Sequence, residues 1–563
     1  MDTSPNVLDI RNLQVSFGKK ENTVIVVKDI SCTIPAGKIT ALVGESGSGK
    51  SVTALSILGL LPESANIKGE ILFKGTDLLK ADQESLRQVR GNQVSMIFQE
   101  PMTSLNPLFT CGDQVTEAIR QHQNISKQDA RQQATELFSL VELPDPAGML
   151  DRYPHQLSGG QKQRVMIAMA ISCNPSLIIA DEPTTALDVR VQKNIMSLLL
   201  RLQREQGMSV LLITHDLGLV ADIADKTIVM FRGNIVEEGE TREILANPRE
   251  AYTRALLACR PAANKKGEPL PVVSDFMGAA KEEIDIKKTL PAMDAPAASK
   301  LILDVQDLSV TFKRKASLFG KTPAGLKAVD HVSFQVFSQE TVALVGESGC
   351  GKTTLGRAIL QLIKPDTGKI ILEGKDLARY KEAELRKLRK EMQVVFQDPY
   401  GSLNPRITIG DAITEPLKVH GLYGSKAGRK ERAAFMLEQV DMKPDQLERY
   451  PHQFSGGQRQ RICIARALAL SPSFLVFDES VSALDVSVQA QVLNLINRLK
   501  AEMKFTSLFI SHDLSVVHYI SDRILVMKAG QIIESGDADQ VYFHPQHLYT
   551  IELIESIPGK RRI

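Results

Sequence analysis

Short apolar runs that end at a glycine or an acid recur along the chain, and this pattern predicts buried parallel strands. Three runs in the first half are matched by three in the second: Ile39–Val43, Leu177–Ala180 and Val210–Ile213, then Val342–Val345, Phe474–Phe477 and Ser507–Ile510. Apolar residues at helical spacing follow them, for example at positions 191, 195, 198, 199 and 202. The alternation of strand and helix predicts an α/β fold with a mainly parallel sheet.

The chain contains one long repeat. The sequence GESGSGKS at 44–51 returns as GESGCGKT 302 residues later, and YPHQLSGGQKQR at 153–164 returns as YPHQFSGGQRQR 297 residues later. This indicates a duplicated domain. We predict a first domain at residues 1–260, a second at 301–563, and between them, at 261–300, a linker rich in proline and alanine with no net charge.

Composition limits the possible functions. The 563 residues include 68 Lys or Arg against 66 Asp or Glu, a net charge of +2 that argues against wholesale wrapping of nucleic acid. The longest stretch without a charged residue, Val165–Ala180, is shorter than the ~20 apolar residues of a membrane-spanning helix. The six cysteines form no Cys-x-x-Cys pair. We therefore expect a cytosolic chain, or one bound peripherally to a membrane through a partner.

Two copies of Gly-x-x-x-x-Gly-Lys-Ser/Thr each follow an apolar run and precede a helical pattern. The glycines let successive backbone N–H groups curl around phosphate oxygens. Lys50 and Lys352 then reach the β- and γ-phosphates, and the hydroxyls of Ser51 and Thr353 ligate Mg²⁺. One such match is compatible with a plain glycine-rich turn, but two in the same context favour nucleotide binding.

Paired acids end a later apolar run in each copy, at Asp181–Glu182 and Asp478–Glu479. The first acid suits the Mg²⁺ shell, and the second suits orienting or deprotonating the water that attacks the γ-phosphate. His215 and His512 follow the next apolar run and suit a hydrogen bond to that phosphate. An isolated acidic pair is more often a solvated turn, and a lone histidine a surface or core residue, so the repeated context is what favours function.

Ser-Gly-Gly-Gln opens a long helical pattern in each copy, at 158–161 and 455–458. A serine N-cap and closely approaching glycines make a helix N-terminus that can bind an anion, although a plain helix cap has the same sequence. Each copy already has a phosphate loop. A second anion site per copy is best explained if it serves a nucleotide held by the other copy.

These motifs, in this order and twice over, resemble the ATP-binding-cassette (ABC) ATPase domain, with its Walker A loop, signature, Walker B strand and switch histidine. The resemblance covers residues 7–258 and 301–550. MIFQEPMTSLNP, VVFQDPYGSLNP, NPREAYT and HPQHLYT resemble the peptide importer subfamily, with its fused two-cassette ATPases for glutathione, microcin C or oligopeptides. The family implies two tandem P-loop nucleotide-binding domains, each with a mainly parallel core sheet, an antiparallel subdomain and a helical signature subdomain.

The resemblance also implies two ATP sites between head-to-tail domains, each combining one phosphate loop with the signature of the other domain. It implies catalytic roles for Glu182, Glu479, His215 and His512, and coupling roles for Asp188 and Asp485. It implies Mg²⁺ ligation by Ser51, Gln99, Asp181, Thr353, Gln397 and Asp478. It implies ATP binding by Phe17, Gly44, Glu45, Ser46, Gly47, Ser48, Gly49, Lys50, Ser51, Val52, Ser158, Gly159, Gly160, Gln161, Phe312, Gly346, Glu347, Ser348, Gly349, Cys350, Gly351, Lys352, Thr353, Thr354, Ser455, Gly456, Gly457 and Gln458. Phe17 and Phe312 are the implied adenine-stacking residues, with Phe319 as a rival in the second domain.

The second copy departs from the family pattern at Phe454, before the signature serine, and at Ser480, after the catalytic glutamate. Neither departure removes a group that touches nucleotide, so both sites are predicted to hydrolyse ATP. Many relatives hold an iron–sulfur cluster on a cysteine-rich tail, but here only Cys259 lies near the first such position and no cysteine follows Cys463. We expect ATP and Mg²⁺ as cofactors and no iron–sulfur cluster.

The predicted function is the ATP-hydrolysing subunit of a bacterial importer for peptides or peptide-like compounds, such as a dipeptide, an oligopeptide or glutathione. Its expected partners are two transmembrane permease subunits and, indirectly, an extracytoplasmic substrate-binding protein, with no nucleic acid. It is expected to bind peripherally to the cytoplasmic side of the inner membrane, with its two cassettes paired within one chain. A nickel importer and a ribosome-associated tandem-cassette translation factor are the alternatives, the latter disfavoured by the proline-broken, net-neutral linker.

Overall fold

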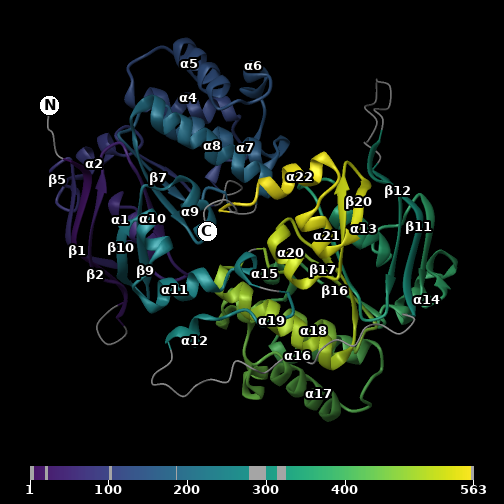
Figure 1. Cartoon of the computed structure of the whole chain (residues 1–563). Coiled ribbons are helices and arrows are strands. Elements are labelled where there is room, and N and C mark those ends of the chain that lie inside the picture. Colours follow the sequence, from purple (N-terminus) through teal and green to yellow (C-terminus); the bar gives the residue numbers. More distant parts are fainter. Residues whose placement is uncertain are drawn as a thin grey trace. The chain divides into compact units, whose positions relative to one another are not determined.

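The computed structural model describes residues 5–18, 23–99, 104–184, 187–264, 266–277, 300–312, 325–482 and 484–559. These residues form two compact units, each of which contains one copy of the repeat (Figure 1). The first unit holds the chain up to Leu257 together with Val273–Met277 and 558–559, and the second holds Ala258–Val272 and the chain from 300 to Ile557. The domain boundaries at residues 260 and 300 stay predictions.

The core sheet of the first unit has six strands in the order β10-β9-β3-β8-β7-β6. Five of them pair in parallel, and β10 is antiparallel to β9. Their bounds are β3 (Ile39–Val43), β6 (Val94–Ile97), β7 (Leu177–Asp181), β8 (Ser209–Thr214), β9 (Lys226–Phe231) and β10 (Asn234–Glu240). β3, β7 and β8 are buried along their whole length, as expected for strands covered on both faces. The predicted mainly parallel sheet is confirmed.

A second, antiparallel sheet has the order β2-β1-β4-β5. Its strands are β1 (Asn6–Phe17), β2 (Val24–Pro35), β4 (Ala65–Phe73) and β5 (Thr76–Asp77). One hydrophobic cluster joins this sheet to α1 (Lys50–Ile57) and to the core sheet, through residues such as Leu8, Ile57 and Ile179. The antiparallel sheet therefore covers the helix that begins at the end of the phosphate loop.

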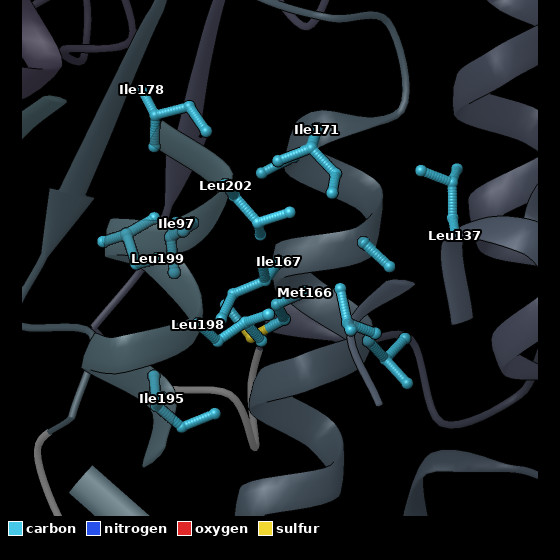
Figure 2. Packing of buried hydrophobic residues seen from close by; sticks show 14 of the residues in the cluster. Ile97, Leu137, Met166, Ile167, Ile171, Ile178, Ile195, Leu198, Leu199 and Leu202 are labelled. Atoms are coloured by element: carbon cyan, nitrogen blue, oxygen red, sulfur yellow. The ribbon is translucent and has the colours of Figure 1, made fainter. Parts of the chain in front are cut away.

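The other α-helices described in the first unit are α2 (Gln83–Val89), α4 (Cys111–His122), α5 (Lys127–Leu140), α6 (Pro146–Met149), α7 (Gly159–Ile171), α8 (Val189–Gln206), α9 (Leu217–Ile223), α10 (Thr241–Ala246), α11 (Ala251–Ala258, whose last residue groups with the second unit) and α12 (Val273–Met277). Figure 2 shows the cluster that fixes α7 and α8 to the core sheet, with Ile167 of α7 and Leu198 of α8 close together. The apolar stripe predicted on α8 is buried at Ile195, Leu198, Leu199 and Leu202, with Val191 partly buried. The signature helix α7 thus packs against α8, the helix that follows the Walker B strand β7 along the chain.

The second unit repeats this architecture. Its core sheet has the order β16-β17-β18-β13-β19-β20 and its antiparallel sheet the order β12-β11-β14-β15. The strands are β11 (Leu301–Phe312), β12 (Leu326–Phe337), β13 (Thr341–Val345), β14 (Thr367–Leu372), β15 (Lys375–Asp376), β16 (Met392–Val395), β17 (Phe474–Asp478), β18 (Thr506–Ile510), β19 (Arg523–Lys528) and β20 (Gln531–Asp537). The helices are α13 (Lys352–Ile359), α14 (Glu382–Leu388), α15 (Pro399–Ser402), α16 (Ile409–Val419), α17 (Lys426–Gln439), α18 (Gly456–Leu468), α19 (Val486–Met503), α20 (Leu514–Ile520), α21 (Ala538–Phe543) and α22 (Leu548–Glu555).

The segment 258–272, which follows the first copy of the repeat, packs on α19 and α20 in the second unit. The Leu270 N–H donates to Oδ1 of Asn494 (2.8 Å), and Nδ2 of Asn494 donates to the Leu270 carbonyl (2.8 Å). The Tyr519 hydroxyl donates to the Glu268 carbonyl (2.8 Å), and Leu270 is 2 % exposed. Part of the predicted linker is therefore an ordered element of the second unit, while residues 278–299 lie outside the described ones.

Candidate active site

The phosphate loop of each unit leads from a core strand into a helix, as predicted. The loop at 44–49 joins β3 to α1, and its counterpart at 346–351 joins β13 to α13. Lys50 is 5 % exposed, and its Nζ donates to the carbonyls of Gly44 and Glu45 (both 2.8 Å). Lys352 donates in the same way to the carbonyls of Gly346 and Glu347 (2.8 and 2.9 Å). Both lysines are thus held inside their own loops.

The glycines are required by the backbone of the loop. Gly49 has φ +105° at the N-cap of α1, a left-handed conformation that L side chains rarely adopt. A Cβ on Gly44 would collide with the carbonyl oxygen of Met230. Two positions at the tip of each loop are exposed: Ser46 and Gly47, and Ser348 and Gly349. Ser48 and Cys350 are buried, and Val52 and Thr354 are partly buried. The loop therefore offers its exposed side to a ligand.

The first acid of each pair lies at the end of a core strand beside the loop hydroxyl. The Thr353 hydroxyl donates to Oδ1 of Asp478 (2.9 Å). Burial raises the pKa of Asp181, and the hydrogen bond from Ser51 offsets part of that rise. Burial also raises the pKa of Asp478, against the effect of Thr353. Oδ1 of Asp181 is buried without a hydrogen-bond partner among the described residues. An oxygen that is buried and unsatisfied in this way is suited to a cation.

The second acid gathers side chains from two further loops. Nε2 of Gln99 donates to Oε2 of Glu182 (2.9 Å), and Nδ1 of His215 lies 3.1 Å from Oε1 of the same carboxylate. The sequence separations are 83 and 33 residues, so the fold alone brings these groups together. Glu182 has φ +46°, a strained conformation for this residue type that is common at functional sites.

The second unit repeats the cluster with looser geometry at the histidine. Nε2 of Gln397 donates to Oε2 of Glu479 (2.9 Å), and Nδ1 of His512 lies 3.7 Å from that carboxylate oxygen. Glu479 also has a positive φ, of +49°. Lys352 Nζ lies 4.0 Å from Oε1 of Glu479.

The glutamate and the histidine of each cluster shift each other's charge state in the same sense. Burial by itself would lower the pKa of His215, but the hydrogen bond and charge of Glu182 outweigh it, so this pKa is raised. Burial would raise the pKa of Glu479, but the hydrogen bond and charge of His512, with a smaller effect of Lys352, lower it. Both shifts favour an ionised carboxylate beside a protonated imidazole.

Each signature segment caps its helix and remains accessible. The Ser158 hydroxyl accepts from the Gln161 N–H (3.3 Å), and Oε1 of Gln161 accepts from the Ser158 N–H (3.0 Å), which makes a capping box at the start of α7. Ser455 and Gln458 cap α18 with the same two distances. Ser158 and Gly159 are exposed, as are Ser455 and Gln458, whereas Gly456 is partly buried.

The second glycine of each signature, Gly160 or Gly457, allows two helices to approach closely. A Cβ on Gly160 would lie 2.8 Å from Cγ1 of Val191 on α8, and one on Gly457 would collide with Cγ1 of Val488 on α19. At Gly159 the nearest atom would be 3.4 Å away, an ordinary contact. The second glycine is therefore a packing requirement as well as part of the motif.

The predicted coupling and adenine residues have simple local surroundings. Asp188 accepts from the Val191 N–H (2.9 Å) and caps α8, and Asp485 accepts from the Val488 N–H (3.0 Å) and caps α19. Phe17 is partly buried at the end of β1, and Phe312 is 45 % exposed at the end of β11. Phe319 lies outside the described residues. The coupling and stacking roles stay predictions.

Two tyrosines that contact the phosphate loops were not among the predicted site residues. The Tyr252 hydroxyl accepts from the Glu45 N–H (2.9 Å), and the Tyr549 hydroxyl accepts from the Glu347 N–H (3.0 Å). Each bond spans more than two hundred residues, 207 in the first unit and 202 in the second. The available signal was the repeat itself, which relates Tyr252 to Tyr549 at the same 297-residue offset as the catalytic residues.

Comparison with known proteins places the chain in a family. The ABC transporter model matches residues 27–185 and 329–482, and the model for the oligopeptide/dipeptide transporter C-terminal region matches 236–279 and 533–562. The glutathione import ATP-binding protein GsiA of Pectobacterium atrosepticum is 46 % identical over 560 residues, covering 98 % of this chain and 89 % of that protein. GsiA of Salmonella typhimurium is 46 % identical over 563 residues (99 % and 90 %), and GsiA of Escherichia coli O157:H7 is 45 % identical over 565 residues (98 % and 90 %).

The fold and the two phosphate-loop sites define the class: an ATPase whose hydrolysis is coupled to transport. Within that class, the chain belongs to the ABC transporter family, as a tandem two-cassette ATP-binding subunit of the oligopeptide import type. The predicted ABC resemblance, fold class and ATPase activity are confirmed.

Proposed function

We propose that this chain powers the import of glutathione or a similar short peptide by hydrolysing ATP at both of its phosphate loops. The observation that carries the proposal is the cluster of glutamine, glutamate and histidine beside each loop, made by Gln99, Glu182 and His215 in the first unit. Its counterpart in the second unit has the same three residue types at the same positions of the repeat. Because both clusters are complete, the two sites are proposed to be catalytically competent.

Glu182 and Glu479 are the proposed bases. The Glu182 carboxylate is held at one oxygen by Gln99 and at the other by His215. Gln397 and His512 both lie against Oε2 of Glu479, so one orientation of each carboxylate is favoured before a water arrives. The charge and hydrogen bond of His512 lower the pKa of Glu479 and so favour the ionised form, which can orient the attacking water and receive its proton. His215 and His512 are proposed to turn their other ring nitrogen toward the γ-phosphate.

The residues beside the loop fit Mg²⁺. Ser51 and Asp181, and likewise Thr353 and Asp478, provide hard oxygen donors next to the loop lysine. The unsatisfied, buried Oδ1 of Asp181 supports this assignment. When bound, Mg²⁺ supplies charge neutralisation for the phosphates. Gln99 and Gln397 are proposed to join its ligand shell.

The two signatures are proposed to serve the nucleotide of the other cassette. Their capped, accessible helix N-termini are suited to phosphate oxygens. Two ATP molecules would draw the cassettes together, and loss of the γ-phosphates would remove the groups that hold the signatures. Asp188 and Asp485 are proposed to couple the two sites, since each begins the helix that contacts a signature glycine.

The relatives support a proposal for the cargo and the partners. Proteins 45–46 % identical over nearly the whole chain are glutathione import ATP-binding proteins, which supports glutathione as the first cargo to test. No helix among the described residues is long and apolar enough to span a membrane. The import role of these relatives supports placing the transport path in two separate permease subunits, fed by an extracytoplasmic binding protein, with this chain bound peripherally on the cytoplasmic side of the inner membrane.

The catalytic assignment is tested with Glu182→Gln, Glu479→Gln and the double variant. We expect partial loss of ATPase activity in each single variant, and in the double variant near-complete loss with ATP retained, because the loops remain intact. Glu205→Gln, on the exposed end of α8, is the matched control and should hydrolyse ATP at the wild-type rate. A double variant that turns over at the wild-type rate would refute the assignment. Uptake of labelled glutathione by vesicles containing the chain and its co-purified permeases tests the cargo, and uptake of nickel instead would overturn it.

A further inference from the structure

One peptide unit of each phosphate loop is held at both ends. In the first unit, the Glu45 N–H donates to the hydroxyl of Tyr252 (2.9 Å), and the Gly44 carbonyl accepts from Nζ of Lys50 (2.8 Å). These two groups belong to the same peptide unit. Because the N–H and C=O of a trans peptide point in opposite directions, the tyrosine and the lysine hold the unit from opposite sides.

The second unit contains the same arrangement. The Glu347 N–H donates to the hydroxyl of Tyr549 (3.0 Å), and the Gly346 carbonyl accepts from Nζ of Lys352 (2.8 Å). The two loops differ in sequence at Ser48 and Cys350, yet the clamp is unchanged. A feature that survives this difference is a property of the loop backbone and the tyrosine.

Both tyrosine rings are buried, but they lie against different neighbours. Tyr252 is 1 % exposed and its ring lies 4.2 Å from that of Phe231, whereas Tyr549 is 2 % exposed and lies 4.7 Å beneath Nζ of Lys528. Phe231 and Lys528 occupy equivalent positions in the repeat. Since the ring contacts differ while the hydrogen bond does not, the phenol oxygen is the shared element.

ATP binding would affect the lysine hydrogen bonds and the tyrosine hydrogen bond of the loop differently. The lysine must turn from the loop carbonyls to the phosphates, because its ammonium is the group that reaches the β- and γ-phosphates. The tyrosine bond lies on the N–H side and can persist. It can therefore keep the peptide unit in place while the lysine changes partners.

We infer that Tyr252 and Tyr549 are positioning residues for ATP, whose phenol oxygens hold the phosphate loop in its binding conformation during the exchange of lysine partners. The inference rests on the proposed use of Lys50 and Lys352 as phosphate ligands. Both tyrosines lie in the stretches matched by the oligopeptide/dipeptide transporter C-terminal region, outside those matched by the ABC transporter model. A segment particular to this import type thus contacts the nucleotide loop directly.

The test uses Tyr252→Phe, Tyr549→Phe and the double variant of the full chain, which keep the ring and remove the hydroxyl. The KM for ATP of the double variant should rise about 3- to 10-fold, the effect of one lost hydrogen bond at each site, while kcat at saturating ATP changes less than about twofold. Tyr519→Phe is the matched control: it loses a hydroxyl that bonds Glu268 rather than a phosphate loop, and its KM should stay at the wild-type value. A merely structural role would lower thermal stability without this split between KM and kcat.

Amide hydrogen exchange provides a measurement that needs no variant. In the nucleotide-free wild-type chain, the Glu45 amide should exchange more slowly than that of exposed Ser46. A KM within twofold of wild type in the double variant, or a Glu45 amide that exchanges as fast as that of Ser46, overturns the inference. Lys50→Ala with Lys352→Ala separates the two claims: if ATP binding survives that change, the proposed phosphate-binding role of the lysines fails first.

Discussion

The side-chain amide of Asn494 is predicted to hold the segment 258–272 in place. It makes two hydrogen bonds to the backbone of Leu270, one in each direction, and Leu270 is almost fully buried. Asn494→Ala removes both partners of a backbone N–H and C=O that have little access to water. Leaving a buried polar group unsatisfied costs about 1–3 kcal/mol, so two such groups cost about 2–6 kcal/mol. Because Asn494 is only partly buried and water can replace its amide in part, we expect the docked segment to lose an amount in the lower part of this range, about 2–4 kcal/mol.

The assay is native-state hydrogen exchange, because a chain with two units need not unfold in one transition. A loss of about 2–4 kcal/mol corresponds to amide exchange in the segment that is about 30- to 1000-fold faster. Asn494→Asp is the graded control, since it keeps an acceptor for the Leu270 N–H but loses the donor to the carbonyl. Its effect should be smaller than that of the alanine variant.

Unchanged exchange in residues 258–272 of Asn494→Ala would refute this reasoning. It would mean that the buried residues Cys259 and Pro261, rather than the amide, hold the segment. An effect spread equally over both units would also refute it, because the lost bonds lie in the second unit alone.

Three further predictions concern the cassettes. Gly160→Ala should lower the stability of the first unit by about 1–3 kcal/mol because the new Cβ would press on the next helix, whereas Gly159→Ala should cost much less; thermal unfolding compares them. Because the pKa of His215 is raised, its contribution to stability is complete below the unfolded pKa of about 6.5 and is lost as pH rises through the folded pKa. His215→Gln should therefore lower Tm more at about pH 6 than at about pH 9. Thr353→Val should raise the Mg²⁺ concentration needed for half-maximal ATPase activity about tenfold by removing the hydroxyl next to Asp478, and an unchanged Mg²⁺ titration would count against that ligand assignment.

The spacing of apolar residues predicted the strands and helices, because their patterns recur within a few residues of the chain. Runs such as Ile39–Val43 are apolar because both faces of the core sheet are covered, and the α8 stripe is apolar because one helix face packs on that sheet. The phosphate loops could be found because their glycines and lysine act within a few residues of each other. The repeat then supported each of these predictions with a second copy of the same pattern.

The remainder depends on contacts between distant residues. Nothing near Tyr252 predicts that its hydroxyl meets an amide 207 residues away, since a buried tyrosine in a helix has the same local pattern as a core residue. The positive φ of Glu182 could not be predicted from the sequence either, because it belongs to the turn that directly follows β7. The proline-rich stretch after residue 260 has the composition of a linker, but Leu270 within it is buried by partners on α19 that the local composition does not reveal.

The docked segment also bears on how such a gene could be divided. A polypeptide that started at residue 301 would lack the segment 258–272, which contacts Asn494 and Tyr519. That surface of the second cassette would then be uncovered. Fission of the gene between residues 278 and 299 would instead leave the first product carrying a piece of the second one's surface. Two separately encoded cassettes would then bind each other through residues 258–272. This part of the former linker would act as a specific dimerisation segment.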